Sequence, residues 1–466
     1  MEKIPTFPII WKGDDPSSPY EEARVGRIFN QRRPSRYPLA VVQAREPAHV
    51  AEAVKLAIDR KSRVSVRSGG HSWSVSSIRD NAILVDLGDY HEMTLDETTG
   101  VVQVSPSTTS AELNTFLHPR GRMFAGGHCP DVAVGGFLLL GGVGWNARNW
   151  GWACEQVVAL DVVTADGRML RADVQENTEL YWAARGCGPG FPGVITRFHL
   201  QTRPLKKVMR SSLYAYPTAK YRCAFEWVLK LTPTFDKETE IVMISTYPPG
   251  VDEQHIMVMF ITFQDSEDSA QQALRPAEDS FPDEPVLHWF CQETDLEKEY
   301  AGQAHANPAG HRYHCENAFL RDGEDVVSVL EKAMTTSPSK ETYTFWYPFY
   351  PWSKRPLPDM ALSLQADNYI AMYTICKDEA NDENCQAWTR DIMDEMKKYS
   401  VGSYLGDMDL QIRTTKFWSD DHAARLMDIR RRWDPNGVIC GYLDAGDRSG
   451  VAGLDNGLDG KAQVSL

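Results

Sequence analysis

Arg67-Ser68-Gly69-Gly70-His71 is the stretch that decides how this chain folds, because it turns directly after a predicted strand over residues 64–66. A second glycine-rich stretch, residues 126–144, contains Cys129 and closes with Gly-Gly-Val-Gly. Small residues let backbone N–H groups approach a ligand closely, and each stretch sets one nucleophilic side chain beside them. Together they predict a pyrophosphate-bearing cofactor that the main chain holds and that His71 and Cys129 could bond.

The composition is that of a soluble globular protein. Of 466 residues, 42% are hydrophobic and 24% are charged, and this length predicts two or three intergrown domains. The net charge of −15 argues against a nucleic-acid or anionic-membrane partner. No run approaches the ~20 apolar residues that a membrane-spanning helix needs. Residues 1–14 lack a signal-peptide pattern, so we expect a cytoplasmic protein, or a secreted one if a leader has been removed.

Cysteine and histidine spacing gives no pattern for a metal centre. The nine cysteines are scattered without a C-x-x-C pair, which predicts free and mostly buried thiols. Cys376 and Cys385 are the pair that could join in an oxidising compartment. His311, His314 and Glu316 do not share one helical face, so we expect no metal site there.

The texture of the sequence divides the chain into five segments. We expect a polar lead-in, a cofactor domain, a substrate domain, a terminal segment that completes the cofactor domain, and a disordered tail, over residues 1–36, 37–204, 205–402, 403–444 and 445–466.

Local patterns predict the elements of the two large segments. Apolar residues at 3.6-residue spacing predict a helix over 47–59, and the Asp166-Gly167 turn predicts a hairpin of strands 157–164 and 169–172. Residues 124–144 are too glycine-rich for a simple helix and too apolar for a linker, so this run should be buried against something flat. In 205–402, strand-like segments alternate with helices, which predicts an antiparallel sheet covered by helices on one face.

Each motif has a plainer interpretation when it is taken alone. The turn after residue 66 lacks the G-x-G-x-x-G spacing of a Rossmann fingerprint, and no P-loop lysine follows it. A Gly-Gly turn is usually only a turn, His71 could be an ordinary loop histidine, and Cys129 an inert thiol. The aromatic run over 345–352 could line the pocket of a flat substrate or simply fill a core. Only the joint occurrence of the glycine-rich motifs favours a cofactor site.

Four spaced motifs carry a resemblance to a known family. They read Arg-Ser-Gly-Gly-His-Ser at 67–72, Cys-Pro-Asp-Val-Ala-Val-Gly-Gly at 129–136, Val-Val-Thr-Ala-Asp-Gly at 162–167 and Glu-Asn-Thr-Glu-Leu-Tyr-Trp-Ala-Ala-Arg-Gly at 176–186. They resemble the flavin-binding domain of the vanillyl-alcohol-oxidase/PCMH superfamily, in its berberine-bridge-enzyme-like branch. Residues 404–407 and 433–437 resemble the terminal segment of that branch. The implied fold is α+β: a PCMH-type FAD-binding domain of two subdomains, plus an antiparallel-sheet substrate domain with covering helices.

The resemblance implies a bicovalent flavin. His71 would attach at the 8α position of FAD and Cys129 at the 6-position; two such tethers can raise the potential of the flavin and fix its ring. The implied cofactor-binding residues are Arg67, Ser68, Gly69, Gly70, His71, Ser72, Cys129, Pro130, Val132, Gly135, Gly136, Gly141, Gly142, Gly144, Gly193 and Val194.

The resemblance also implies candidates for catalysis. Tyr404 matches a tyrosine that faces the flavin and is the first choice for the base; Asp407 is the second, and Gln365 a polar liner. Val132 matches a small gatekeeper of oxygen-reactive relatives, which favours an oxidase. Phe137 departs from the family pattern, because several relatives have a histidine there.

The resemblance implies an FAD-dependent oxidase. It would move a hydride from an alcohol, a carbohydrate or a secondary metabolite to the flavin, and then reduce dioxygen to hydrogen peroxide. The alternatives are a flavin-containing cyclase with no net redox change, a dehydrogenase with another electron acceptor, and a flavin-binding protein without turnover. The expected partners are a small-molecule substrate and dioxygen, with no nucleic acid and no membrane, in a monomer or weak homodimer.

Overall fold

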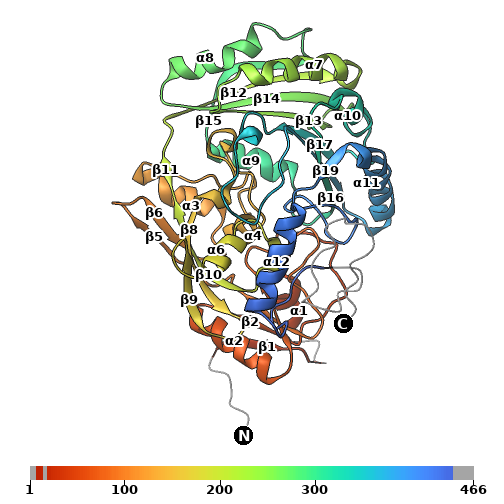
Figure 1. Ribbon diagram of the computed structural model, residues 1–466. Helices are drawn as coiled ribbons and strands as arrows, with labels where there is room; N and C mark the ends of the chain where they lie inside the picture. The colour runs from red at the N-terminus through yellow and green to blue at the C-terminus, as the bar shows by residue number, and fades with distance from the viewer. Residues whose placement is uncertain (1–6, 14–17, 444–466) are drawn as a thin grey trace.

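The computed structural model describes residues 7–13 and 18–443, and the predicted disordered tail lies outside them. Three main sheets, one two-stranded pair and their helices form the molecule, with strands from the first two hundred residues in the lower half of Figure 1 and one large sheet in the upper half. Helices and mostly antiparallel strands alternate along the chain. The α+β fold predicted from the resemblance is therefore confirmed.

The first sheet is mainly parallel. Its order is β1 (Ile9–Trp11), β2 (Ala40–Gln43), β4 (Ala82–Asp86) and β3 (Arg63–Arg67), and the helices beside it are α1 (Tyr20–Val25) and α2 (Pro47–Asp59). β2 and β3 both pair with β4 in parallel, because α2 carries the chain across between them. Helix α2 buries Val50 and Val54 against Val64 and Val85 of the sheet. The helix predicted over 47–59 is thus confirmed.

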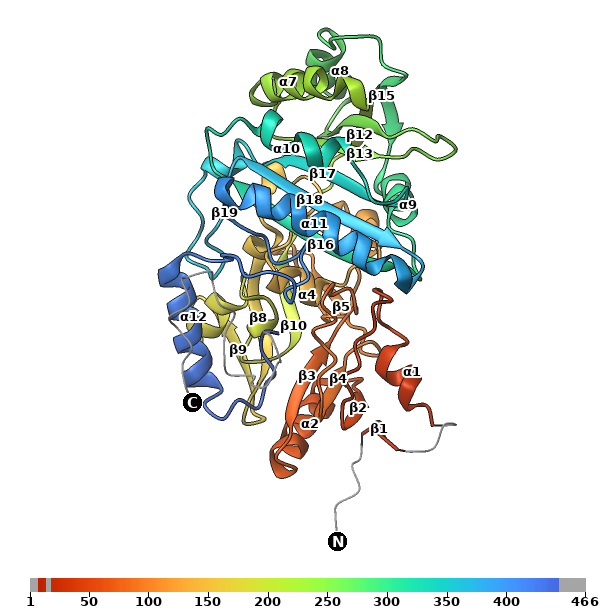
Figure 2. The ribbon, with the colours of Figure 1, turned by 90° about the vertical axis from the view of Figure 1, so that its right-hand side faces the viewer.

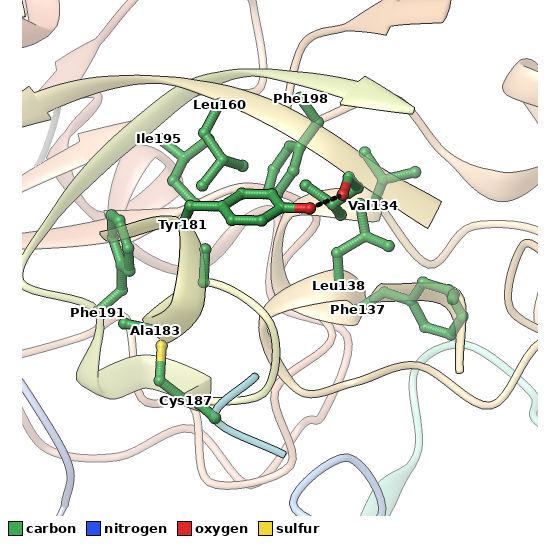
Figure 3. Close-up of a cluster of buried hydrophobic side chains, with 14 of the residues drawn as sticks. Val134, Phe137, Leu138, Leu160, Tyr181, Ala183, Cys187, Phe191, Ile195 and Phe198 are labelled. Atoms are coloured by element: carbon green, nitrogen blue, oxygen red, sulfur yellow. Dashed lines mark hydrogen bonds between the residues drawn. The ribbon is translucent and has the colours of Figure 1, made fainter. Parts of the chain in front are cut away.

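The second sheet is antiparallel. Its order is β5 (Met93–Asp96), β6 (Val101–Val104), β10 (Gly193–Gln201), β8 (Val157–Thr164) and β9 (Met169–Asp173). It is accompanied by the helices α3 (Ser110–Leu117), α4 (Val134–Leu139), α5 (Ala147–Trp150) and α6 (Thr178–Ala183), and by the short strand pair β7 (Arg122–Met123) and β11 (Arg203–Pro204). The predicted hairpin is β8–β9. Figure 3 shows Leu160 and Phe198 of this sheet facing Leu138 of α4, with Tyr181 of α6 donating to the Val157 carbonyl at 2.8 Å.

The glycine-rich run over 124–144 is buried, as expected, but it contains one short helix, α4. Gly127 and Gly144 form an isolated antiparallel bridge that folds the run back on itself. A Cβ at Gly144 would lie 2.1 Å from the Ala125 oxygen, so the bridge needs glycine.

The third sheet holds eight antiparallel strands. Its order is β15 (Leu287–Thr294), β12 (Val208–Pro217), β14 (His255–Gln264), β13 (Thr239–Thr246), β17 (Tyr343–Pro348), β18 (Asn368–Cys376), β16 (Arg312–Leu320) and β19 (Ser400–Gly402). One face carries α7 (Tyr221–Leu231), α8 (Glu267–Glu278), α10 (Val326–Thr335) and α11 (Asp382–Met396). The other face looks toward the two smaller sheets, with α9 (Leu296–Ala306) on that side (Figure 2). The prediction of helices over one face is confirmed.

The end of the chain returns to its beginning. Helix α12 (Asp420–Trp433) packs beside α6, and the following residues pair with β3 through a parallel bridge between Val64 and Ile439 (Figure 1). The cofactor-side sheets are therefore built from both ends of the sequence. No helix within residues 7–13 and 18–443 combines the length and the apolar character needed to span a bilayer.

Candidate active site

A cavity of about 1000 Å³ lies between the two smaller sheets and the open face of the large sheet. Its lower wall is the turn after β3 together with the segment over 127–143, and its upper wall is formed by β13, β14, β17 and β18. A volume of this size exceeds that of most drug-sized sites, so it has room for a long cofactor and a substrate together.

The turn after β3 presents unused backbone donors to the cavity. Among residues 7–13 and 18–443, no acceptor takes a hydrogen bond from the N–H groups of Ser68 through Ser72. Gly70 has φ +82°, and a Cβ there would lie 1.8 Å from the Arg27 oxygen, so only glycine fits. Buried N–H groups rarely lack a partner. This donor set fits the oxygens of a pyrophosphate.

Two buried hydroxyls add to this donor set. The Oγ atoms of Ser65 and Ser77 have no hydrogen-bond partner in the described part of the chain, and both residues line the cavity. Beside them, a Cβ added to Gly136 would meet no protein atom within 4 Å. Open space next to orphaned polar atoms is what a bound dinucleotide would fill, so the residues present fit FAD.

Arg67 supports the turn from beneath. Its guanidinium is buried, pairs with Asp86 at 2.6 Å and donates to the carbonyls of Ala23 and Arg24. Because its charge is neutralised within the protein, Arg67 holds the turn in position rather than supplying charge to a phosphate.

His71 and Cys129 line the same cavity from different loops. The imidazole of His71 stacks on Phe29 with centroids 4.2 Å apart, and its Nε2 lies 2.9 Å from an oxygen of Asp131. Burial tends to raise the pKa of Asp131, but the hydrogen bond and charge of His71 outweigh it and lower that pKa. Burial raises the pKa of the Cys129 thiol to about 12, and the carboxylates of Asp131 and Asp407 add to the shift.

Most of the predicted cofactor residues reach the cavity. Those that line it are Arg67, Ser68, Gly69, Gly70, His71, Ser72, Cys129, Val132, Gly135, Gly136, Gly193 and Val194. Pro130, Gly141, Gly142 and Gly144 do not belong to its lining.

The last glycines of the run serve contacts within the protein. A Cβ at Gly141 would lie 2.4 Å from Leu362, and one at Gly142 would lie 2.8 Å from the Phe137 ring. Sequence reasoning took these glycines as positions for close approach of the cofactor; the structure uses them for close approach of buried side chains. The ring of Phe137 itself lies at the cavity wall.

Of the three predicted catalytic residues, two face the cavity and one does not. The Tyr404 oxygen accepts a hydrogen bond from the Gly142 N–H at 3.1 Å. Burial raises the pKa of Tyr404 far above its ordinary value, and Asp407 raises it further. Gln365 lies outside the cavity, where its amide donates to the Ser353 and Arg355 carbonyls and accepts from Trp152. Gln365 stabilises this part of the chain, because its amide nitrogen and oxygen are both hydrogen-bonded to protein groups.

Asp407 is held by two tyrosines that sequence reasoning did not single out. Its carboxylate accepts from the hydroxyl of Tyr369 at 2.7 Å and from that of Tyr373 at 2.5 Å. Burial raises the pKa of Asp407, and these two hydrogen bonds oppose the rise. Both tyrosines point to one face of β18 because they are four residues apart on a strand. That alternation was visible in the sequence, but not which face met the cavity.

A second buried carboxylate was also missed. Glu240 of β13 lines the cavity, accepts the backbone N–H groups of Asn146 at 2.5 Å and Ala147 at 3.4 Å, and lies 3.4 Å from Nε2 of His128. No local pattern marks this site, since Glu240 and His128 meet only through the fold.

The upper wall of the cavity is mostly apolar. Side chains from β13 and β14 form one part of it, namely Val242, Ile244, Met257, Met259 and Ile261. The aromatic run on β17 divides by strand alternation: Phe345 and Tyr347 line the cavity, whereas Trp346 packs against Phe225 in the core beneath the helices. Both interpretations of that run were therefore partly correct.

Comparison with known proteins gives consistent matches. The family model for the FAD binding domain matches residues 38–173. The FAD-linked oxidoreductase ptmO of Penicillium ochrochloron is 37% identical over 436 residues, which cover 93% of this chain and 96% of that protein. The FAD-linked oxidoreductase nodO of Hypoxylon pulicicidum is 37% identical over 438 residues, 94% of this chain and 98% of that protein.

Solved structures share the fold at low identity. The BBE-like 1 protein of Physcomitrella patens aligns with a TM-score of 0.79 at 18% identity, covering 93% of this chain and 96% of that one. Berberine bridge enzyme from Eschscholzia californica gives 0.78 at 15% identity, covering 94% and 98%. With relatives 37% identical over more than nine tenths of both chains, the chain belongs to the FAD-linked oxidoreductases, and it shares its fold with the berberine bridge enzyme and the BBE-like 1 protein.

Proposed function

We propose that this protein is an oxidase with a bicovalently bound FAD, which oxidises a hydroxyl group of an apolar secondary metabolite. The observation that supports the proposal most is that His71 and Cys129, from two separate loops, line one cavity beside a row of free backbone N–H groups. When bound, FAD supplies the hydride acceptor and passes two electrons to dioxygen, which yields hydrogen peroxide.

The surroundings of His71 leave one nitrogen free for a covalent bond. Its Nε2 faces Asp131 at 2.9 Å, while Nδ1 has no partner within residues 7–13 and 18–443. A proton held at Nε2 by the carboxylate makes Nδ1 the nucleophile. Asp131 therefore supports attachment by fixing the tautomer of the imidazole.

The remaining cofactor contacts divide by chemistry. The N–H groups of Ser68 through Ser72 would hold the pyrophosphate, and the hydroxyls of Ser65 and Ser77 are free to bind polar groups of the nucleotide. Gly193 and Val194 of β10, with the segment around Ile439, would enclose the adenine end.

The apolar wall supports an apolar substrate over a sugar. Each hydroxyl of a bound sugar needs a partner, because burying a hydroxyl without a hydrogen bond costs about 1–3 kcal/mol. Three hydroxyls of the wall are already used: that of Tyr343 donates to Asn307 at 2.7 Å, and those of Tyr369 and Tyr373 donate to Asp407. The Tyr347 hydroxyl has no partner in the described part of the chain, and most of the remaining wall is aliphatic and aromatic surface.

Val132 supports dioxygen as the electron acceptor. It lines the cavity two residues beyond Pro130, at the position where the family resemblance places a small gatekeeper. Among proteins of this fold, an isoleucine-to-valine variant of Phl p 4 is described as a glucose oxidase and its wild type as a glucose dehydrogenase.

Attachment of the flavin is tested by denaturing the protein in acid. Yellow colour that stays with the precipitate shows a covalent bond, and the variants His71→Ala and Cys129→Ala should each keep one bond while the double variant releases free FAD. Cys440→Ala is the matched control, since that thiol also lines the cavity but is not a proposed attachment point. Free FAD in the wild-type supernatant would overturn the bicovalent proposal.

The reaction is tested by anaerobic mixing with apolar alcohols and with sugars. Cinnamyl alcohol and farnesol should bleach the flavin, and air should restore the colour with one equivalent of hydrogen peroxide; cellobiose should do neither. Bleaching by cellobiose alone would overturn the substrate class. Bleaching that air does not reverse would identify a dehydrogenase, and no bleaching by any of the three would overturn alcohol oxidation.

A further inference from the structure

Oxidation of a hydroxyl group requires a proton acceptor, and the groups near Tyr404 are poorly suited to that task. Tyr404 is a phenol whose pKa burial has raised far above neutrality. Asp407 already accepts two tyrosine hydroxyls, so its oxygens are engaged. Tyr369 and Tyr373 have pKa values that burial and Asp407 raise well above the ordinary range, and both are therefore donors. Another group that lines the cavity must therefore accept the proton of the substrate hydroxyl.

His128 has the arrangement of an oriented base. It directly precedes Cys129, lines the cavity and packs against the ring of Trp145 with ring centroids 4.4 Å apart. Its Nε2 faces the Glu240 carboxylate at 3.4 Å, and such contacts are often long before a ligand binds. Nδ1 of His128 has no hydrogen-bond partner in the chain over 7–13 and 18–443. A carboxylate on one nitrogen fixes the tautomer and leaves the other as acceptor.

Glu240 is fixed more firmly than an ordinary cavity carboxylate. Its side chain is 5% exposed, and one oxygen accepts the N–H groups of Asn146 and Ala147. Because the backbone at the start of α5 holds that oxygen, the other oxygen points at His128 in a fixed direction. The pair thus has a base and an orienting group, which is the geometry shared by many proton-accepting histidines.

We propose that His128 accepts the proton of the substrate hydroxyl, and that Glu240 is the residue that positions it. This inference rests on the proposed alcohol oxidation. The O–H bond breaks and an N–H bond forms at Nδ1 of His128. The neighbouring carbon would lose its hydride, with two electrons, to the flavin that these residues would hold, and the alcohol would become a carbonyl. The proton then leaves His128 for solvent through the cavity.

Carboxylates from several elements lie around His128. Glu240 of β13 is 3.4 Å from its Nε2, and Glu299 of α9 and Asp407 of the loop after β19 interact with it electrostatically; the titratable groups Cys129 and Tyr347 are further neighbours. Positive charge on His128 opposes the burial that raises the pKa values of Glu299 and Asp407. These carboxylates therefore lie where positive charge would develop in the proposed step.

The test compares flavin-loaded wild type with His128→Gln, Glu240→Gln and His288→Ala. His288 is a matched control, since it also pairs with a glutamate, Glu278 at 2.9 Å, on strand β15 outside the cavity lining. With cinnamyl alcohol as the probe, His128→Gln should slow anaerobic flavin reduction about 10²- to 10⁴-fold, the usual contribution of a general base. KM should change little. Glu240→Gln keeps the backbone contacts and should slow reduction less, while His288→Ala should match wild type.

The pH profile separates a base from a structural residue. General-base catalysis gives the rate of flavin reduction an acid limb, which should be present in wild type and should vanish in His128→Gln. In His128→Ala, added imidazole should restore part of the rate. Wild-type rates in His128→Gln with the acid limb intact would overturn the proposal, as would loss of rate that imidazole does not restore in a folded, flavin-loaded His128→Ala.

A measurement that does not read the reaction rate separates this inference from the proposed function. Diethyl pyrocarbonate acylates neutral imidazole, and peptide mass spectrometry reports the extent at His128. Cinnamyl alcohol should slow acylation of His128 and leave that of His288 unchanged. If no alcohol reduces the wild-type flavin, alcohol oxidation fails regardless of His128. If reduction occurs but the alcohol does not protect His128, the proton acceptor has been misplaced.

Discussion

Tyr404 illustrates how surroundings change the role of a side chain. Its phenol is held protonated at neutral pH, because burial raises its pKa far above the ordinary value and Asp407 adds to the effect. Its oxygen is fixed by the Gly142 N–H at 3.1 Å, which leaves the proton free to point into the cavity. In the proposed oxidation, this phenol would donate to the substrate oxygen and orient it.

From this role we predict that Tyr404→Phe slows anaerobic flavin reduction by cinnamyl alcohol about 10²-fold, the cost of one lost donor. The acid limb of the pH profile should stay in place, because the phenol does not titrate there. Stopped-flow absorbance of the flavin across that limb measures both quantities. Tyr221→Phe is the control, since that hydroxyl donates to the Val327 carbonyl beneath helix α7. If the acid limb of the pH profile shifts in Tyr404→Phe, then Tyr404 is the base.

At the residue scale, sequence alone identified the groups whose signal is local. His71 and Cys129 stood out because each sits within a glycine-rich motif. Glu240 and His128 could not be paired from sequence, since 112 positions separate them and only the docking of β13 against the lower wall brings them together. Gln365 was chosen for its polarity, yet polarity does not show whether an amide faces a cavity or a carbonyl.

At the scale of elements, periodicity succeeded where one face of an element is buried. Helix α2 and the hairpin β8–β9 were predicted closely for that reason. Strand β16 was missed: it reads Arg-Tyr-His-Cys-Glu-Asn-Ala-Phe-Leu, and eight of its nine residues are buried, His314 and Glu316 included. Helices cover one face of its sheet and the cofactor side covers the other, so the alternation of polar and apolar residues is lost. A strand with buried charged residues is therefore difficult to recognise from its sequence.

The five-stranded sheet is joined by a charged network centred on Arg197. Its guanidinium lies 2.6 Å from Glu92 and 2.7 Å from Asp161, and His199 lies 3.1 Å from the same aspartate. Burial favours higher pKa values for the two acids, but the hydrogen bonds and charges of their partners outweigh it and lower both. Carboxylates with depressed pKa values contribute stability above their unfolded values near about 4, and this stability is lost as the pH falls below them.

We therefore predict that Arg197→Ala lowers the free energy of unfolding by about 1–2 kcal/mol at neutral pH. The difference from wild type should begin to shrink below about pH 4.5, where the acids of the unfolded chain take up protons. Urea unfolding followed by circular dichroism at several pH values measures this. Arg168→Ala removes an exposed pair with Asp166 and should stay within about 0.5 kcal/mol of wild type. A difference independent of pH would rule out the charged network as its source.

At the scale of the whole molecule, the segment between α1 and β2 joins the cofactor side to the large sheet. Asn30 of this segment is fully buried. Its amide donates to the Trp73 carbonyl at 2.9 Å, just after the turn that follows β3, and to the Tyr313 carbonyl on β16 at 3.1 Å. Its oxygen accepts the Tyr313 N–H at 3.0 Å. The Asn30 side chain therefore supplies hydrogen bonds to backbone groups of both parts of the molecule at the place where they meet.

Removing this link should weaken the whole molecule more than one polar side chain ordinarily does. We predict that Asn30→Ala lowers the free energy of unfolding by about 2–4 kcal/mol, because the Trp73 carbonyl and the Tyr313 N–H lose their amide partner and the Tyr313 carbonyl keeps only Arg32, at 3.3 Å. Asn149→Ala is the control: that amide makes one bond to Glu238 at 3.3 Å and should cost less than about 1 kcal/mol. Thermal unfolding followed by flavin fluorescence should shift down together with circular dichroism, since the link supports both units. If Asn30→Ala unfolds at the same temperature as Asn149→Ala, the two units are held together by packing alone.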